Sequence, residues 1–428
     1  MTIPLNTPDL LSLASVSEKS EQWAAQDSID VRNPVVESSE FAYRATDLVH
    51  INDDGVKNAA KYIRQKLLVE KYTPRTWRTH ALHICPSEPY NPEDPLNKSV
   101  LDWIFLISSL NFSFWSEKEG RPDRYGVEWR AGWDSVETKI WTGYWSLVAA
   151  LNRALEEDIP ITDPHFYSSE TLCPDSLIEH VFRKAPQSTE SIPLLKERIA
   201  VMRECAPGIA RVLIILRKGY GGSFKGFLDD FQRQHDGQGT SLDLATMVAN
   251  TFPSFRDEVY YEGTKVCLWK RAQILVAETW AAFYPPSPAE PHPLFPGSQG
   301  PQISRLTMFA DYRVPQILHH LCILTYPASL LRKLHAHTPL APGSREEISL
   351  RASSIIAVER VREEILRLIK HEEGGDSDTV SRAGVVSSVV IDFYLWDLAK
   401  KVESGEQKIE NIDTAEMVPI HRTRSIWY

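Results

Sequence analysis

Three aspartates of this chain stand close to aromatic residues. Asp311 lies in the segment TMFADYRVP, with Phe309 before it and Tyr312 after it. Asp392 and Asp397 lie in the segment IDFYLWD, among further aromatic residues. An ionised carboxylate in an apolar setting is costly unless it is paired or hydrogen-bonded, so each of these positions requires a structural or a functional partner.

The local sequence allows two explanations for these acids. The structural one is a buried salt bridge, for which Arg313, Arg271 and Lys400 are available. The functional one is a site for a flat nucleobase, which stacks on an aromatic ring while the acids accept N–H bonds from its edge. If the bond cut is glycosidic, the sugar passes through an oxocarbenium-like state that a carboxylate stabilises or captures covalently.

The standard motifs for other chemistry are absent from the sequence. The chain has no G-x-G-x-x-G loop, no G-x-x-x-x-G-K-[ST] loop, no H-E-x-x-H helix and no G-x-S-x-G elbow. Residues 219–223 (GYGGS) lack a following lysine and are interpreted as a turn between helices. His319 and His320 have no matching third ligand, so we interpret them as structural and expect no metal site.

The elements that must position the acids are predicted to be helices. Apolar residues recur at i, i+3 and i+4 spacing in many segments, whereas few segments alternate like strands. The pattern therefore predicts an all-α, or mainly α, fold. The expected helices cover residues 56–70, 101–115 with a break at Asn111, 141–155, 194–216, 224–233, 266–284, a segment after Pro315, 350–370 and 385–403. The segment 116–139 is expected to be a loop or a short hairpin.

Composition changes along the chain suggest one large domain with additions. Residues 1–44 are predicted to be a polar, partly disordered N-terminal extension, and residues 45–428 to form the domain. A proline-rich surface insert is expected at 285–301 and a flexible acidic linker at 372–384.

Charge and cysteine usage limit the partners and the compartment. The formal net charge is -10 and the pI is about 5.8, which disfavours binding to long nucleic acids. The 5 cysteines form no C-x-x-C pair, so reduced thiols in the cytoplasm, or alternatively the nucleus, are expected. No signal peptide and no apolar run long enough to span a membrane is recognised.

Several segments, taken together and in order, resemble the queuosine salvage protein family, the queuosine-5'-phosphate N-glycosylase/hydrolases. They are LNFSFW, GYWSLVAALNRALEEDIPIT, FPSFRD, KRAQILVAETW, TMFADYRVPQILHHL, DFYLWDLA and the ending HRTRSIWY. The resemblance runs from about residue 45 to the C-terminus. It implies an all-helical fold similar to helix-hairpin-helix DNA glycosylases. It also implies hydrolysis of queuosine 5'-monophosphate to queuine and ribose 5-phosphate, without a metal or organic cofactor.

The resemblance also assigns site residues. The catalytic aspartate of the family falls on Asp311. The base-contacting positions fall on Phe309, Asp311, Asp392, Phe393 and Asp397. In the family an aromatic residue, often tyrosine, stands at the position of Phe393, so this chain would keep stacking and lack the hydroxyl. A histidine of the family's site aligns with His83 in HALHICP, with His80 as a near rival. Asp392 and Asp397 differ by roughly 140° around a helix, so both reach one pocket only if it is wide or the helix irregular.

A phosphorylated substrate requires cations or a helix N-terminus. The local sequence offers Lys270, Arg271 and Arg313 as phosphate ligands, with His421, Arg422 and Arg424 behind them. The helical spacing of Trp115, Tyr144 and Trp145 favours ordinary core positions over a pocket lining.

Two other functions remain open from the sequence. A DNA glycosylase would use the same fold and aspartate, but the acidic balance and the lack of a basic stripe disfavour it. A non-catalytic queuine or nucleotide carrier would keep the base-binding residues and show no turnover. The expected partner is a small molecule, with no long nucleic acid and no membrane.

Overall fold

The structure is a computed structural model that describes residues 33–203, 222–372 and 386–428. Several expectations fall wholly or partly outside these ranges. They concern the N-terminal extension up to residue 32, the second half of the helix expected at 194–216, most of the turn at 219–223, and nearly all of the acidic linker at 372–384.

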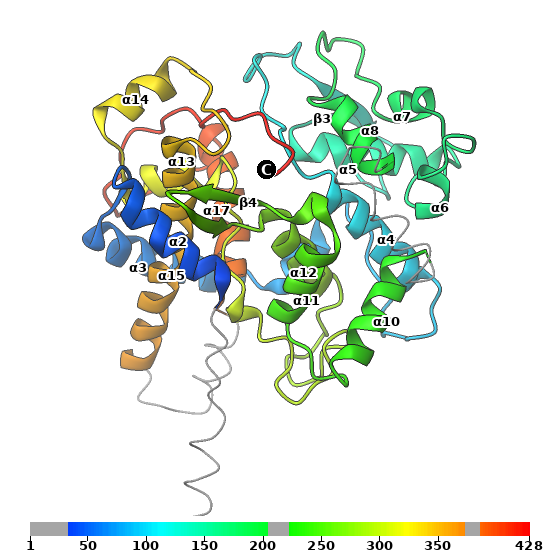
Figure 1. Cartoon of the computed structure of the whole chain (residues 1–428), viewed down its shortest axis with the longest axis horizontal. Coiled ribbons are helices and arrows are strands. Elements are labelled where there is room, and N and C mark those ends of the chain that lie inside the picture. Colours follow the sequence, from blue (N-terminus) through cyan, green and yellow to red (C-terminus); the bar gives the residue numbers. More distant parts are fainter. Residues whose placement is uncertain (1–32, 204–221, 373–385) are drawn as a thin grey trace, which may run out of the picture. The chain divides into compact units, whose positions relative to one another are not determined.

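The described residues are mainly helical, which confirms the predicted fold class (Figure 1). The α-helices are α2 (Pro34–Thr46), α3 (Asp53–Val69), α4 (Leu96–Ser109), α5 (Tyr144–Glu156), α6 (Pro164–Tyr167), α7 (Asp175–Val181), α8 (Leu195–Arg203), α10 (Phe224–Gln234), α11 (Ser241–Thr251), α12 (Lys270–Ala282), α13 (Val314–His320), α14 (Ala328–His335), α15 (Arg345–Glu372) and α17 (Ser388–Glu403). Short 3-10 helices are η1 (Pro74–Thr79), η2 (Pro253–Phe255) and η3 (Ile303–Arg305). The finer expectation, a helix-hairpin-helix arrangement, stays a prediction.

Strands occur only as short antiparallel pairs within the described ranges. The pairs are β1 (His50–Ile51) with β6 (Leu324–Thr325), β2 (Gly126–Arg130) with β3 (Thr138–Thr142), and β4 (Glu258–Tyr261) with β5 (Thr264–Cys267). The segment expected to be a loop or a short hairpin thus contains the β2–β3 hairpin. Two-stranded hairpins are marginal alone, and this one packs against α5.

Helix α2 belongs to the folded unit and extends across the predicted domain start at residue 45. Residues 34–428 make one compact unit. Helix α2 buries Val35 and Ala42 and packs against α15. The predicted boundary at residue 45 therefore falls inside a packed helix. The proline-rich insert at 285–301 consists of turns and loops, anchored by the buried residues His292 and Phe295.

Helix α12 lies at the centre of this unit, between the helices drawn around α15 and those drawn around α5 (Figure 1). All residues of α12 are buried, including the charged Lys270, Arg271 and Glu278. It packs against α4, α11 and η1. A helix that is buried all round belongs to the interior of a large protein, so its polar side chains must all find partners there.

The chain after α4 is non-helical but also buried. Helix α4 ends at Ser109, slightly before the break expected at Asn111. The guanidinium of Arg198 donates to the carbonyls of Leu110 and Phe112. It also lies 4.4 Å from the centre of the Phe112 ring. These contacts satisfy backbone groups that no helix or sheet pairs.

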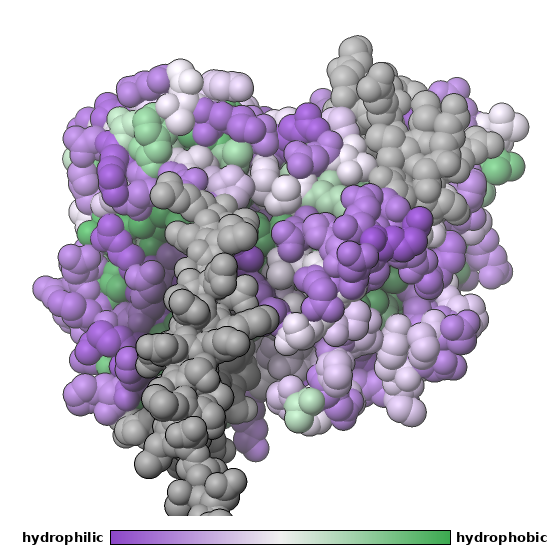
Figure 2. All heavy atoms as spheres, turned by 60° about the horizontal axis from the view of Figure 1, so that its bottom comes forward, coloured by the Kyte–Doolittle hydropathy of each residue, from purple (hydrophilic) through white to green (hydrophobic). Residues whose placement is uncertain are grey.

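Figure 2 shows one face of the molecule, coloured by hydropathy. The face in Figure 2 is mostly hydrophilic, with apolar residues in small scattered patches. Among the helices of the described ranges, none combines the length and the apolar character that crossing a membrane requires.

A buried cluster of charges ties α15 to the start of α12. Arg351 of α15 forms ion pairs with Asp257 and Glu347, and its Nε donates to the carbonyl of Ala310 at 2.8 Å. Asp257 in turn accepts the backbone N–H of Lys270 at 3.4 Å, the first residue of α12. One guanidinium therefore holds both the start of α12 and the backbone immediately before residue 311.

Replacing Arg351 with methionine should destabilise the protein strongly. The change leaves two buried carboxylates without their cation, which costs about 3–5 kcal/mol. Chemical denaturation at neutral pH measures the loss. Arg367→Met on the same helix is the matched control, because Arg367 pairs only with Glu364 at the surface and its loss should leave the midpoint unchanged. Equal midpoints for the Arg351 variant and the wild type would contradict this role.

Candidate active site

A cavity of about 1050 Å³ opens beside α12 and α17. Its lining comes from η1 and the following loop, α5, α12, the segment before α13, α17 and the C-terminal segment. The sequence-predicted residues in the lining are His83, Lys270, Phe309, Asp311, Arg313, Asp392, Phe393 and Asp397. The structure therefore brings these residues together, whereas Arg271 and the secondary candidates His421 and Arg424 lie outside the lining.

Asp311 is held by backbone donors at the start of α13. Its Oδ1 accepts the N–H groups of Arg313 at 2.8 Å and Val314 at 2.9 Å. Within the described ranges, Asp311 forms no ion pair and its Oδ2 accepts no hydrogen bond. The salt bridge to Arg313 considered from the sequence is not formed, because the guanidinium pairs with Glu403 at 2.6 Å. One oxygen of a fixed carboxylate thus remains for a ligand.

Asp392, on α17, bonds the chain segment that carries Asp311. Its Oδ1 accepts the backbone N–H of Phe309 at 2.9 Å, and only 3% of the residue is exposed. Burial, reinforced by the negative charge of Asp311, raises the pKa of Asp392 well above its ordinary value. Asp392 therefore keeps its proton to higher pH than an exposed aspartate.

The rings of Phe309 and Phe393 lie on this side of the cavity. Their centres are 5.9 Å apart and their planes are tilted by 57°. Phe309 comes from the segment before α13 and Phe393 from α17, so two distant parts of the chain supply the two rings. Both line the cavity, where they offer faces or edges to a flat ligand.

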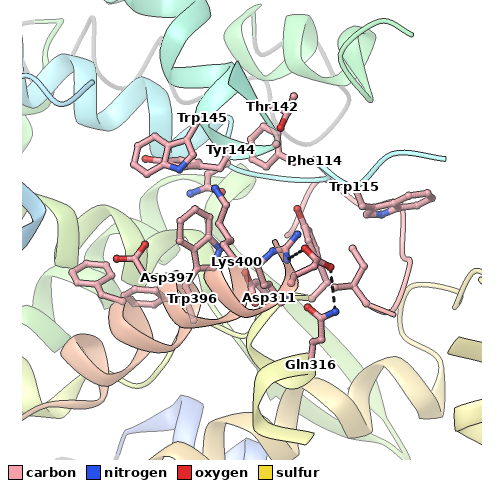
Figure 3. Close-up of a pocket in the computed structure, with 18 of the residues that line it drawn as sticks. Phe114, Trp115, Thr142, Tyr144, Trp145, Asp311, Gln316, Trp396, Asp397 and Lys400 are labelled. Carbon is pink, nitrogen blue, oxygen red and sulfur yellow. Dashed lines mark hydrogen bonds and ion pairs between the residues drawn. The ribbon is translucent and has the colours of Figure 1, made fainter. Parts of the chain in front are cut away.

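Asp397 occupies another part of the same cavity. The hydroxyl of Tyr72 donates to its Oδ2 at 3.4 Å, and burial raises its pKa. Asp397 and Trp396 are both on α17, and Figure 3 shows them apart from Asp311. Asp392 and Asp397 are separated by roughly 140° around the helix, so they can share a pocket only if it is wide or the helix is irregular. Both line this cavity because it is wide.

Lys270 lies at the end of the cavity that holds Asp311. Its Nζ donates to the carbonyl of Asn111 at 3.1 Å and to the Asn111 Oδ1 at 3.2 Å. Burial lowers the pKa of Lys270 to about 8, while the charges of Asp311 and Asp392 act in the opposite direction. The ammonium thus balances the two aspartates.

Arg271 faces away from the cavity. Its guanidinium donates to the carbonyls of Ser109 and Ser254 and packs against the rings of Phe112 and Phe255. Lys270 lines the cavity from the same helix, whereas Arg271 is not part of the lining. Arg271 is therefore a structural residue in this fold.

His83 and His80 both line the cavity as parts of an aromatic stack. The His83 ring lies 3.9 Å from Trp77, and the His80 ring lies 3.5 Å from Trp145 at an angle of 4°. Nδ1 of His83 donates to the carbonyl of Trp77 at 2.6 Å, while its Nε2 has no partner within the described chain. Burial lowers the pKa of His83 to about 3 and that of His80 to about 4. A neutral His83 therefore presents an acceptor nitrogen.

Comparison with known proteins decides the family. The sequence model described as "Queuosine salvage protein" matches residues 90–428. A Schizosaccharomyces pombe relative is 37% identical over 401 residues, covering 92% of this chain and 99% of its own length. Relatives from Nematostella vectensis and Bos taurus are 33% and 34% identical, each over 92% of this chain and 97% and 98% of their own lengths. All three are named queuosine 5'-phosphate N-glycosylase/hydrolase. The chain belongs to the queuosine salvage protein family.

In this member of the queuosine salvage family, several lining residues were not predicted. Trp115, Tyr144 and Trp145, expected in the core, line the cavity instead. Figure 3 shows Tyr144 and Trp145 of α5 across from Trp396 and Lys400 of α17. Sequence analysis also missed Glu278 and the role of Lys400, although the spacing of Lys270, Ile274 and Glu278 at i, i+4 and i+8 marks one face of α12.

The remaining histidines and arginines fall into two groups. His319 and His320 bond the carbonyls of Leu324 and Ala415 and lie outside the lining, in agreement with a structural role. No cluster suited to a metal ion is found among the described residues. Of the C-terminal candidates, Arg422 lines the cavity, whereas His421 and Arg424 do not.

The His83 ring should stay neutral far into the acid range. Because burial holds its pKa at about 3, its ¹⁵N resonances should keep the Nδ1–H pattern from pH 7 down to at least about pH 5. An NMR titration measures this, and the spectrum of a His83→Asn variant assigns the signals. Protonation of His83 near the ordinary histidine pKa would contradict the buried acceptor described above.

Proposed function

We propose that this chain hydrolyses the N-glycosidic bond of queuosine 5'-phosphate and releases queuine and ribose 5-phosphate. The names of its relatives support this substrate. The observation that carries the proposal is the placement of Asp311, a fixed carboxylate with one unbonded oxygen beside two phenylalanine rings. That arrangement suits a sugar cation next to a stacked base.

The reaction needs one bond to break and one to form. The C1′–N9 bond breaks, and its electron pair leaves with the base. Asp311 stabilises the positive charge that develops on the ribose, or captures C1′ covalently before water attacks. The oxygen of water finally bonds to C1′. Water loses one proton in this step, and the departing base gains one. The two backbone N–H groups at Asp311 keep the carboxylate oriented throughout, so little reorganisation is needed during the reaction.

The base would stack on one of the rings of Phe309 and Phe393, which are tilted by 57° to each other, with carboxyls at its edge. Asp392 and Asp397 are the proposed acceptors for its N–H groups, and His83 Nε2 adds a neutral acceptor. N–H donors of a bound base would favour the ionised form of Asp392 and lower its raised pKa. Base binding and the release of a proton are therefore expected to occur together.

The phosphate would lie near Lys400, Arg313 and Arg124, which line the cavity. Burial, together with the positive charges of Arg313 and Arg124, lowers the pKa of Lys400 to about 8. Arg313 pairs with Glu403 and Arg124 with Glu119, whereas Lys400 forms no ion pair among the described residues, so an anion would stabilise the charge of Lys400 most. Lys270 is less suited, because its ammonium already balances Asp311 and Asp392.

The other functions considered from the sequence are less well supported. A net charge of -10 disfavours an enzyme that acts on duplex DNA. A carrier would use the same base-binding residues, so only turnover separates it from a hydrolase. The cytoplasm, or the nucleus, remains the expected compartment.

Asp311→Asn should abolish turnover while preserving binding. Loss of the carboxylate removes the charge that stabilises the sugar cation, which should lower kcat by at least about a thousandfold. Release of queuine from queuosine 5'-phosphate is followed by mass spectrometry, and circular dichroism checks the fold of the variant. Asp413→Asn, an exposed aspartate outside the cavity lining, is the control and should retain wild-type turnover. Tight binding without release by the wild type would favour the carrier instead.

Lys400→Met should weaken phosphate recognition. Loss of one charge-assisted hydrogen bond should raise KM for queuosine 5'-phosphate, and Ki for ribose 5-phosphate, by about tenfold or more. Steady-state kinetics with the product as a competitive inhibitor measure both constants. Lys401→Met on the exposed side of α17 is the matched control. An equal rise in both variants would point to general electrostatics and against a phosphate subsite at Lys400.

A further inference from the structure

Glu278 is a buried carboxyl that the proposed reaction leaves unused. It lies on α12, lines the cavity, and is 6% exposed. Among the described residues it forms no ion pair. A carboxyl group taken out of water without a cation is unfavourable unless a ligand or a proton compensates it.

The partners of Glu278 within the protein are mainly hydroxyl groups. Tyr144 of α5 donates to its Oε1 at 3.1 Å, and Ser108 of α4 donates to its Oε2 at 3.4 Å. Lys270, two turns earlier on the same helix, and Trp77 of η1 also favour its ionised form. Burial outweighs these groups and raises the pKa of Glu278 to about 7. The free protein therefore holds a mixture of the neutral and the ionised carboxyl near neutral pH.

Two tryptophan rings pack against the ring of Tyr144, whose hydroxyl bonds Glu278. The Tyr144 ring lies edge-on to Trp145 at 4.9 Å and to Trp396 at 5.9 Å. The Nζ of Lys400 lies 4.5 Å from the centre of the Trp396 ring, so these rings already contact one alkyl-ammonium group. Aromatic faces combined with a carboxylate are a general means of binding such cations.

Queuine carries a group of this chemistry. A secondary amine, protonated at neutral pH, joins its 7-deazaguanine ring to the cyclopentenediol. We propose that Glu278, with Tyr144 and the Trp145–Trp396 rings, binds this ammonium and so distinguishes queuine from guanine and 7-deazaguanine. The inference rests on the proposed function. Asp397 is a weaker candidate, because Lys400 and Lys401 already act on its charge.

The test compares ligands with and without the amine. Calorimetry would measure the affinity of the wild-type protein and of Glu278→Gln for free queuine and for 7-deazaguanine at pH 8. The substitution should weaken queuine binding by about tenfold or more and leave 7-deazaguanine binding unchanged. Glu119→Gln is the matched control, since Glu119 lines the cavity but already pairs with Arg124. An equal loss for both ligands, or no loss for queuine, would overturn the inference.

The pH dependence gives an independent readout. For the wild type, the ratio of the affinity for queuine to that for 7-deazaguanine should rise with pH up to about 7 and then level off, because only the ionised Glu278 attracts the ammonium, whereas Asp392 contacts both bases. Tyr144→Phe removes a hydrogen bond that favours ionisation, so the midpoint should move to higher pH. An unshifted midpoint would contradict the proposal, and this second variant keeps the test valid if Glu278→Gln does not fold.

Turnover separates failure of this inference from failure of the proposed function. A wild type that neither cleaves queuosine 5'-phosphate nor binds queuine would refute the function itself. A wild type that cleaves, with a Glu278→Gln variant that discriminates the two bases as before, would refute only the role of Glu278. A lower kcat with unchanged discrimination would make Glu278 a proton donor to the leaving base, and would also overturn the inference.

Discussion

The site depends on how the fold accommodates one fully buried guanidinium. Arg351 can remain charged inside the protein only because Asp257 and Glu347 pair with it and its Nε has a carbonyl to bond. Such clusters add little net stability, but they allow few alternative arrangements. Here the directional bonds fix Ala310, immediately before Asp311, and Asp257, which precedes the β4–β5 hairpin and accepts the backbone N–H at the start of α12. The positions of Asp311 and Lys270 therefore follow from the core of the fold.

The cavity holds ionisable groups that burial has moved toward their neutral forms. The pKa values of Asp392 and Glu278 are raised, and those of Lys270 and Lys400 are lowered. Each shift arises because the protein only partly compensates the burial of the charge with an opposite charge or a hydrogen-bond partner. A ligand with N–H donors, an ammonium and a phosphate would supply these partners together. The electrostatics of the cavity thus favour a charged nucleotide over an apolar molecule.

The sequence predicted what is encoded locally. Helical spacing located most of the helices, and the aromatic neighbours of Asp311 and Asp392 revealed the main acids. The face that a helix turns to a cavity is not encoded locally, so Lys270 and Arg271 could not be separated. Tyr144 was assigned to the core because a cavity wall has the same apolar pattern as packed core. Glu278 became recognisable only when folding brought it to Tyr144, 134 residues away in the sequence.

All residues of helix α12 are buried, including the three that line the cavity, and this affects the motions open to the site. A helix with an exposed face can fray or open locally, whereas a helix enclosed on all sides exchanges its amide hydrogens mainly through larger unfolding events. Lys270 and Glu278 are therefore carried by one of the least mobile parts of the molecule. Most of the conformational entropy needed to order these two groups is lost when the chain folds, and little remains to be lost when a ligand arrives.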